Sequence, residues 1–155
     1  RETFDNPYYR IALEKPSPLE PEQFTQAYFM QLLAGPDVQK LSAKAALATE
    51  QRIPGLGNGV LQDILWKARL LPRRKISSLT EEEAQKLYVS LMSTLAEMSR
   101  LRGRDTEKDL YGIPGGYLTV MSAKNAGAPC PACGRAIVKE AYMGGSVYTC
   151  PNCQH

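Results

Sequence analysis

The sequence contains little histidine, no long hydrophobic run and no strong excess of either charge. Only one of its 155 residues is a histidine. Because this residue, His155, is the last of the chain, we expect it to be exposed and to have no ligand or catalytic role. No stretch approaches the roughly 18–20 continuous apolar residues of a membrane span. The chain also lacks an initiating Met and the apolar core of a signal peptide, so we expect a processed chain or a fragment.

Charge is distributed unevenly along the chain. The 19 basic and 16 acidic residues give a net charge of +3, which is too small to identify nucleic acid as a partner. Residues 51–104, however, contain 10 basic and 5 acidic residues, a local charge of +5. Such a patch can attract phosphate groups even when the whole chain is nearly neutral.

The apolar residues follow a helical pattern over much of the chain. Hydrophobic residues make up 43% of the sequence, so the chain can bury a core. They recur at three- and four-residue spacing in segments where we expect helices, over residues 22–34, 38–49, 60–70 and 80–101. The last of these begins with a capping-box pattern, Thr80 followed three residues later by Glu83. The sequence therefore predicts a mainly α fold before the C-terminal residues.

The cysteines form one C-terminal motif, Cys130, Cys133, Cys150 and Cys153. Their spacing is C-x2-C-x16-C-x2-C, and each C-x-x-C turn can direct two thiolates at one metal ion. The intervening residues fit a β-hairpin, with Gly144 and Gly145 near its tip. Two disulfides or an iron site are chemically possible, but the pattern favours Zn²⁺. Four thiolate ligands leave no open coordination position, so we expect one structural zinc ion.

A glycine-rich turn precedes the third expected helix. In the segment 55–59 (GLGNG), glycine permits a close approach of another backbone, and the N–H groups at a helix N-terminus can hold a phosphate. The side-chain amide of Asn58 adds one more donor. The same residue types are typical of ordinary turns, so the motif alone leaves both interpretations open.

The glycine turn and the cysteine motif together resemble a known family. Residues 49–59 (TEQRIPGLGNG), followed by residues 61–65 (LQDIL), are similar to the helix–two-turn–helix motif of the formamidopyrimidine-DNA glycosylase / endonuclease VIII family. Residues 130–153 resemble the zinc finger of that family. The two features occur in the order and at the separation found in the family, and the resemblance covers roughly residues 17–155.

The resemblance implies how the chain is divided. We expect a linker or remnant of a preceding domain over residues 1–20 and a helix–two-turn–helix DNA-binding bundle over residues 21–104. A connecting loop with short strands follows over residues 105–128. The chain then ends in a small β-hairpin zinc finger with four cysteine ligands, over residues 129–155.

The resemblance also implies a function in base-excision repair. Members of the family flip a damaged base out of duplex DNA, cut its glycosidic bond and nick the backbone by lyase chemistry. Their nucleophile is an N-terminal proline amine, assisted by a glutamate, in a β-sandwich domain that precedes the helices. Glu2 does not match that glutamate, because no N-terminal proline precedes it. We expect a DNA glycosylase / abasic-site lyase as the parent protein, no catalytic residue in this chain, and no activity of the chain alone.

The expected partner is duplex DNA that contains a damaged base or an abasic site. We expect no membrane association, a monomer, and a cytoplasmic location in a bacterium, on the nucleoid through DNA binding. The alternative comes from another functional class. It is a non-catalytic scaffold that contains zinc, binds nucleic acid or protein, and is complete as it stands.

For the DNA contacts, the resemblance indicates the glycine turn, and charge indicates the basic residues. We expect contacts from Gly57, Asn58 and Gly59, and from the cations Arg73, Arg74 and Lys124. A phosphate-tracking surface and an ordinary solvated face explain the basic residues after the third helix equally well.

One position departs from the family pattern. Relatives usually have an arginine five residues before the third cysteine, where it grips a phosphate beside the lesion, and this chain has Gly145 there. Lys124, Arg135 or Lys139 are candidates to replace it. Alternatively, lesion recognition is altered or lyase activity is poor. Residues 109–117 occupy the place where some relatives carry a flexible segment over the flipped base, although a hairpin entry turn explains them equally well.

Overall fold

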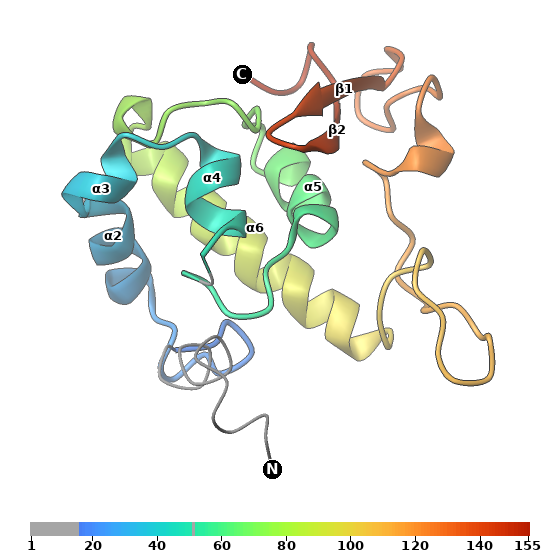
Figure 1. Cartoon of the computed structure of the whole chain (residues 1–155), viewed down its shortest axis with the longest axis horizontal. Coiled ribbons are helices and arrows are strands. Elements are labelled where there is room, and N and C mark those ends of the chain that lie inside the picture. Colours follow the sequence, from blue (N-terminus) through green and yellow to red (C-terminus); the bar gives the residue numbers. More distant parts are fainter. Residues whose placement is uncertain (1–15, 51) are drawn as a thin grey trace.

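The computed structural model describes residues 16–50 and 52–155, and it combines a group of helices with a small two-stranded sheet (Figure 1). The helices are α2 (Gln26–Ala34), α3 (Pro36–Gln39), α4 (Ala43–Ala48), α5 (Asn58–Lys67) and α6 (Glu81–Arg100), with 3-10 turns η2 (Ile76–Ser78) and η3 (Ala123–Asn125). The strands are β1 (Val138–Tyr142) and β2 (Gly145–Thr149). Helices, one small C-terminal hairpin and a cysteine cluster are therefore present. Most of the linker expected over residues 1–20 lies outside the described residues.

Two short helices replace the single helix expected over residues 38–49, and that expectation is wrong. Helix α3 begins with Pro36 at its first position, where the missing N–H costs nothing. Ser42 then leaves the helical conformation with ψ 165°, and its hydroxyl accepts a hydrogen bond from Ala45 N at 3.3 Å. A serine that caps a new helix in this way interrupts the old one.

The capping box expected at the start of α6 is present. Thr80 Oγ1 accepts from Glu83 N at 3.1 Å, and Glu83 Oε1 accepts from Thr80 N at 2.9 Å. The Glu83 carboxylate also binds Arg74 through two hydrogen bonds, of 2.9 and 3.0 Å. These bonds fix the start of the 20-residue helix that crosses behind the others in Figure 1.

The main core lies between α5 and α6. Leu61, Ile64 and Leu65 of α5 are completely buried, and they share one apolar cluster with Leu87 and Leu91 of α6. Burial of each such side chain contributes about 1.5–3 kcal/mol. Because α5 is held on this side along its length, its first residues have a fixed position relative to the rest of the bundle.

The hairpin runs antiparallel, with Val138 opposite Thr149 and Tyr142 opposite Gly145. Its two-residue turn, Met143-Gly144, has φ of 52° and 76°, the combination that a tight right-twisted hairpin needs. Short strands expected in the connecting segment do not form: Tyr117 makes only an isolated bridge with Arg104. Among the described residues, no helix combines the length and the apolar character needed to cross a membrane.

Candidate metal centre and anion-binding surface

The four cysteines meet at one point. Their Sγ atoms all lie within 4.8 Å of one another, although the two pairs are separated by the whole hairpin. The sulfurs of Cys130 and Cys153 are 3.9 Å apart, and those of Cys133 and Cys150 are 3.4 Å apart. The expectation that the two C-x-x-C turns converge is therefore confirmed, and the cluster is a possible site for a metal ion.

The local surroundings shift the pKa values of the cysteines in opposite directions. A hydrogen bond from the backbone N–H of Arg135 is the main cause that lowers the pKa of Cys133 to about 6. Burial is the main cause that raises the pKa of Cys153 to about 12. A divalent cation between the sulfurs would favour the thiolate form of all four, including the buried Cys153.

Hydrogen bonds of two glutamines fasten helix α5 to the cysteine module, residues 129–155. Near its N-terminal end, Gln62 Oε1 accepts from Tyr148 N at 3.1 Å. Beyond its C-terminal end, Leu70 O accepts from Gln154 Nε2 at 2.8 Å, and Gln154 Oε1 accepts from Cys150 N at 2.8 Å. Both glutamines are almost fully buried. The helix and the cysteine module are thus joined, with the hairpin next to α5 (Figure 1).

The glycine turn leads into the N-terminus of α5 and presents free donors. The N-cap Gly57 has no side chain to bind the first N–H groups, and no hydrogen bond to those of Asn58, Gly59 or Val60 is found in residues 16–50 and 52–155. Asn58 Oδ1 accepts from Gln62 Nε2 at 3.0 Å, which turns the Asn58 NH₂ group toward Ser146 O at 3.1 Å. One N–H of that amide remains available, so the turn offers backbone and side-chain donors together.

A buried lysine lies beside this turn. Lys44 is only 4% exposed, and its ammonium donates to Tyr142 O at 2.5 Å. A Cβ atom at Gly145 would lie 3.4 Å from Lys44 Nζ and 3.5 Å from Asn58 Nδ2. Burial lowers the pKa of Lys44, and this lysine forms no ion pair with any described residue. Among the described residues, the cation nearest to the position of the missing arginine is thus Lys44, which the sequence analysis did not identify.

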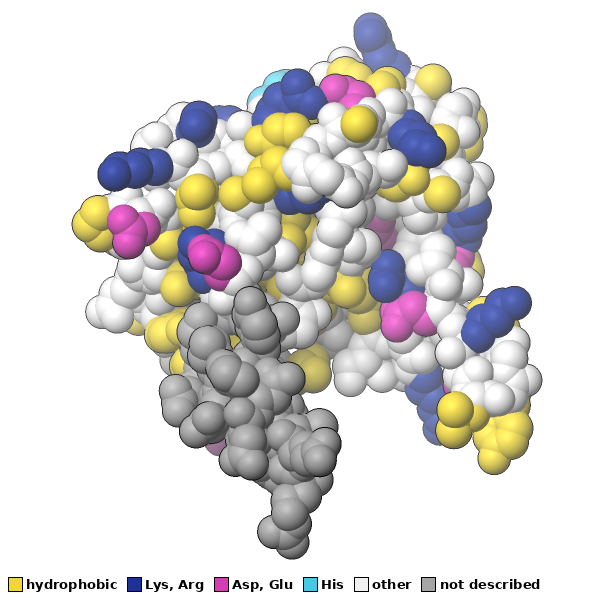
Figure 2. Space-filling model, viewed as in Figure 1, with side chains coloured by type: hydrophobic (Ala, Val, Ile, Leu, Met, Phe, Trp, Pro, Cys, Tyr) yellow, Lys and Arg dark blue, Asp and Glu magenta, His cyan; other side chains and the backbone are white. Residues whose placement is uncertain are grey.

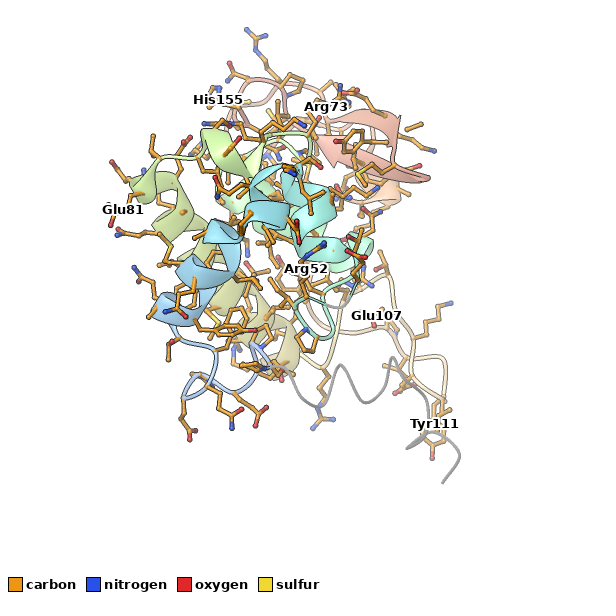
Figure 3. The ribbon with its side chains drawn as sticks, turned by 60° about the vertical axis from the view of Figure 1, so that its left-hand side comes forward. Arg52, Arg73, Glu81, Glu107, Tyr111 and His155 are labelled. Atoms are coloured by element: carbon orange, nitrogen blue, oxygen red, sulfur yellow. The ribbon has the colours of Figure 1, made fainter. Side chains whose placement is uncertain are left out.

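The three cations expected to contact DNA each face a carboxylate. Arg73 pairs with Glu140 at 2.7 Å, at the hairpin end of the molecule (Figure 3). Arg74 binds Glu83 through both terminal nitrogens, and Lys124 pairs with Asp105. Arg73 is half exposed and lies 5.2 Å from the Tyr142 ring centre, so it can still reach a ligand. The guanidinium of Arg74 is held by Glu83 at the start of α6, which leaves it less free to bind a ligand.

The other two candidates for the arginine position, Arg135 and Lys139, are exposed in the cysteine module. Neither forms an ion pair with a described residue. Neither is among the atoms within 4 Å nearest to a Cβ at Gly145, which come from Lys44 and Asn58. Proximity therefore favours Lys44 over both of them.

The segment 105–118 projects from the body as a loop. It carries apolar side chains at its tip, where Leu110 and Tyr111 are 99% and 86% exposed (Figures 2 and 3). At its base, Tyr117 is buried, and its hydroxyl donates to Asp63 Oδ2 at 2.8 Å. The tip is therefore free while the base is anchored to α5.

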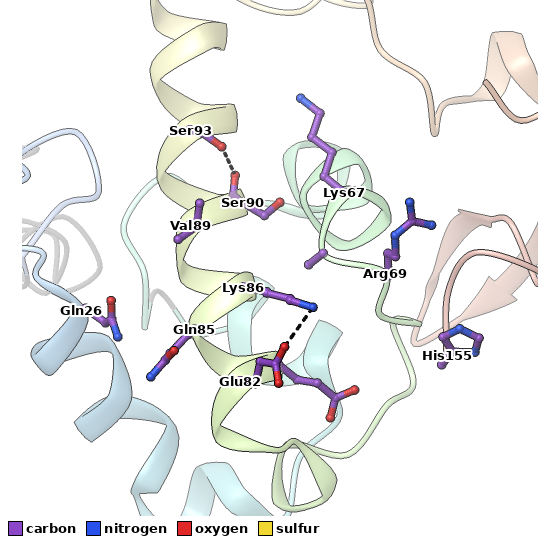
Figure 4. Close-up of a pocket in the computed structure, with 12 residues that line it drawn as sticks. Gln26, Lys67, Arg69, Glu82, Gln85, Lys86, Val89, Ser90, Ser93 and His155 are labelled. Atoms are coloured by element: carbon purple, nitrogen blue, oxygen red, sulfur yellow. Dashed lines mark hydrogen bonds and ion pairs between the residues drawn. The ribbon is translucent and has the colours of Figure 1, made fainter. Parts of the chain in front are cut away.

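A groove of about 810 Å³ lies on another side, between α6 and the residues after α5 (Figure 4). Its walls mix the cations Lys67, Arg69 and Lys86 with the acidic residues Glu82 and Glu83. Lys86 and Glu82 pair with each other at 3.4 Å. Because basic and acidic side chains balance one another along its walls, the groove resembles an ordinary solvated surface, and we assign it no function.

Proteins similar to this chain have been described. A formamidopyrimidine-DNA glycosylase of Thermus thermophilus is 37% identical over 142 residues, which cover 88% of this chain and 53% of that protein. The enzyme of the same name from Symbiobacterium thermophilum is 35% identical, over 90% of this chain and 45% of its own length. This chain spans about half the length of the curated relatives that it matches. No protein-family model matches the chain.

Solved structures of proteins described as Fpg or MutM are also similar to this chain. The crystal structure of MutM (Fpg) from Thermus thermophilus matches 90% of this chain with a TM-score of 0.79 at 35% identity, over 53% of that chain. A complex between Lactococcus lactis Fpg and abasic-site DNA matches 96% of this chain with a TM-score of 0.79 at 25% identity, over 54% of that chain.

Proposed function

This chain belongs to the formamidopyrimidine-DNA glycosylase family, and we propose that it is the DNA-binding part of a base-excision-repair glycosylase and abasic-site lyase. The observation that carries the proposal is the free N-terminus of α5, with Asn58 held against the hairpin of the cysteine module. A relative with the same arrangement of elements has been crystallised with abasic-site DNA. The proposed ligand is therefore the phosphate backbone of damaged duplex DNA.

We also propose that the cysteine cluster holds one structural Zn²⁺. In a tetrahedral site with Zn–S bonds of about 2.3 Å, the sulfurs are about 3.8 Å apart. The distances of 3.9 and 3.4 Å between the paired sulfurs are compatible with such a site. When bound, the ion would cross-link the two C-x-x-C turns, while Gln62 and Gln154 hold the module on α5.

The division of the chain follows from the same proposal. The DNA-binding bundle corresponds to residues 21–104, the connecting segment to residues 105–128 and the zinc finger to residues 129–155. Gly57, Asn58 and Gly59 would bind phosphate through N–H donors, with Arg73 as an outer cation and Arg74 and Lys124 as structural neighbours. DNA binding would place the protein on the bacterial nucleoid in the cytoplasm.

The proposal is tested by binding of the 155-residue chain to a labelled duplex that contains an abasic-site analogue. The affinity should fall steeply with rising salt, because counterions are released when phosphates are bound. The chain alone should neither cut an abasic-site duplex nor be trapped on it by borohydride. A Kd that does not depend on salt would contradict phosphate binding, and strand cutting would contradict the absence of a nucleophile.

Asn58→Ala should weaken DNA binding at least tenfold. A hydrogen bond to a charged group contributes about 1.5–3 kcal/mol, and the alanine removes the amide that faces the ligand. Fluorescence anisotropy at moderate salt measures the effect. Gln31→Ala is the control, since it removes an exposed side-chain amide from α2. If both variants bind like the wild type, Asn58 is not part of the site.

Gly145→Arg should tighten DNA binding about fivefold. A Cβ atom at this position meets its neighbours at ordinary contact distances of 3.4 and 3.5 Å, so the side chain can be accommodated. One more phosphate contact should steepen the slope of log Kd against log salt by about 0.9. Gly145→Gln is the control, because it has a long side chain without charge. An equal gain from both variants would show that charge is not the cause.

A further inference from the structure

The side chain of Arg104 lies beside Gly59, at the start of α5. The chain leaves α6 through Arg102 and Gly103, which have φ of 62° and 98°, and this reversal brings residue 104 back onto α5. A Cβ atom at Gly59 would meet the Arg104 guanidinium, with Nη1 as its nearest neighbour, Cζ at 3.2 Å and Nη2 at 3.4 Å. The guanidinium therefore lies directly over the second residue of α5, and only glycine at that position permits so close an approach.

Glu107 fixes the orientation of this guanidinium. Its Oε1 accepts from Arg104 N at 3.2 Å and from Arg104 Nε at 2.8 Å. A guanidinium has five N–H donors, and Glu107 uses only the one on Nε. In residues 16–50 and 52–155, no acceptor binds Nη1 or Nη2 of Arg104. Figure 3 shows Glu107 where the 105–118 loop joins the body, away from the loop tip at Tyr111.

Other hydrogen-bond donors lie near the free edge of Arg104. Gly59 and Asn58 carry two of the unbound N–H groups at the start of α5, and the Asn58 amide has one N–H to spare. Lys44 approaches the same asparagine from the Gly145 side. The guanidinium of Arg104, the ammonium of Lys44, the side-chain amide of Asn58 and the free backbone N–H groups therefore all lie near the first turn of α5. The side chain of Arg104 is 21% exposed, so it remains accessible to a ligand.

We propose that Arg104 is a phosphodiester-binding residue that completes the anion site of Asn58 and the α5 N-terminus. This inference rests on the proposed DNA binding. The planar fork of Nη1 and Nη2 matches two oxygens of one phosphate, which an ammonium group does not do. Arg104 thus supplies from the α6 side the guanidinium that Gly145 does not supply from the hairpin side.

The test compares Arg104→Gln with Arg100→Gln in the 155-residue chain. Arg100 is an exposed arginine at the end of α6, so the control removes the same charge from another place. The probe is a labelled duplex with a tetrahydrofuran abasic-site analogue, titrated at several KCl concentrations. Arg104→Gln should weaken binding about tenfold at ~0.1 M salt and reduce the salt slope by about 0.9, as the loss of one phosphate contact requires. Arg100→Gln should change Kd less than twofold.

Two further variants keep the test informative if Arg104→Gln unfolds. Arg104→Lys should retain the salt slope but bind more weakly, because the charge remains and the fork is lost. Glu107→Gln should bind about twofold more tightly, because it keeps an acceptor and removes a negative charge. Wild-type affinity and slope in Arg104→Gln, with clear salt-dependent binding by the wild type, would overturn the role of Arg104 alone. Absence of salt-dependent binding by the wild type would overturn the proposed function, and this inference with it.

Discussion

Removal of the metal ion is expected to unfold residues 129–155 and to leave the helical bundle folded. Binding of structural zinc contributes about 10–16 kcal/mol in small zinc modules, and most of that energy stabilises the fold. Among the described residues, the apolar cluster around the cysteines contains five buried side chains, of which three are cysteines: Met121, Cys130, Ile137, Cys150 and Cys153. Without the ion, a hairpin of two five-residue strands has too little apolar contact to persist.

The helical bundle should survive because its core does not depend on the module. Its cluster of buried residues runs from Phe24 to Leu91 and includes no cysteine. The start of α5 would nevertheless change, because Asn58 and Lys44 bind hairpin carbonyl groups that would leave with the module. Metal removal is therefore expected to abolish DNA binding as well.

The single tryptophan makes this result measurable. Trp66 of α5 packs against the cysteine cluster, so its fluorescence emission should shift to longer wavelength when a chelator removes the ion. Cys150→Ser should give the same shift, and Gln31→Ala, which changes an exposed residue of α2, should not. Circular dichroism in the far ultraviolet should report that the helices remain. A metal-free chain that retains the Trp66 emission and the amide protection of β1 and β2 would contradict the expectation.

The features that the sequence predicted correctly are those whose chemistry is local. The two C-x-x-C turns and the capping box of α6 each lie within a few residues, so spacing alone specifies them. The third helix was also expected, although it starts at Asn58 rather than at Val60. The break at Ser42 was missed because an apolar pattern continues through it and only the serine cap interrupts the helix.

The charges were harder to interpret because their partners are distant in the chain. Arg73 pairs with Glu140, 67 residues away, and Lys44 reaches Tyr142 O, 98 residues away. A count of basic residues gives residues 51–104 a charge of +5 but does not reveal which cations are neutralised. Lys44 belongs to no basic run, and Arg104 stands out in the sequence only as the last of three closely spaced arginines, Arg100, Arg102 and Arg104. Only the fold brings the two residues to the glycine turn.

Asp63→Ala is expected to destabilise the chain by about 4 kcal/mol, because each buried donor left without a partner costs about 1–3 kcal/mol. Asp63 is 2% exposed in the middle of α5, and its carboxylate accepts from Tyr117 Oη at 2.8 Å, Met121 N at 2.7 Å and Val120 N at 3.1 and 3.2 Å. For a chain of this size, the melting temperature should fall by about 10 °C.

The partners of Asp63 explain why the effect should be large and why the sequence did not predict it. They lie 54 to 58 residues away and include two consecutive backbone N–H groups. Burial and the Asp63 carboxylate hold the pKa of Tyr117 above its usual range, so this phenol remains a donor. Asp63 therefore anchors the connecting segment to α5, immediately before the residues that lead into the cysteine module.

Asp109→Ala is the control that distinguishes the buried Asp63 from an exposed aspartate. Asp109 also accepts two backbone hydrogen bonds, from Tyr111 N at 2.8 Å and Ile113 N at 3.0 Å, but it is exposed in the projecting loop. Since water can replace its hydrogen bonds, Asp109→Ala should cost less than about 1 kcal/mol. Urea unfolding of both variants measures the difference. Equal losses would mean that burial does not determine the contribution of Asp63, and that the connecting segment is held by its apolar contacts instead.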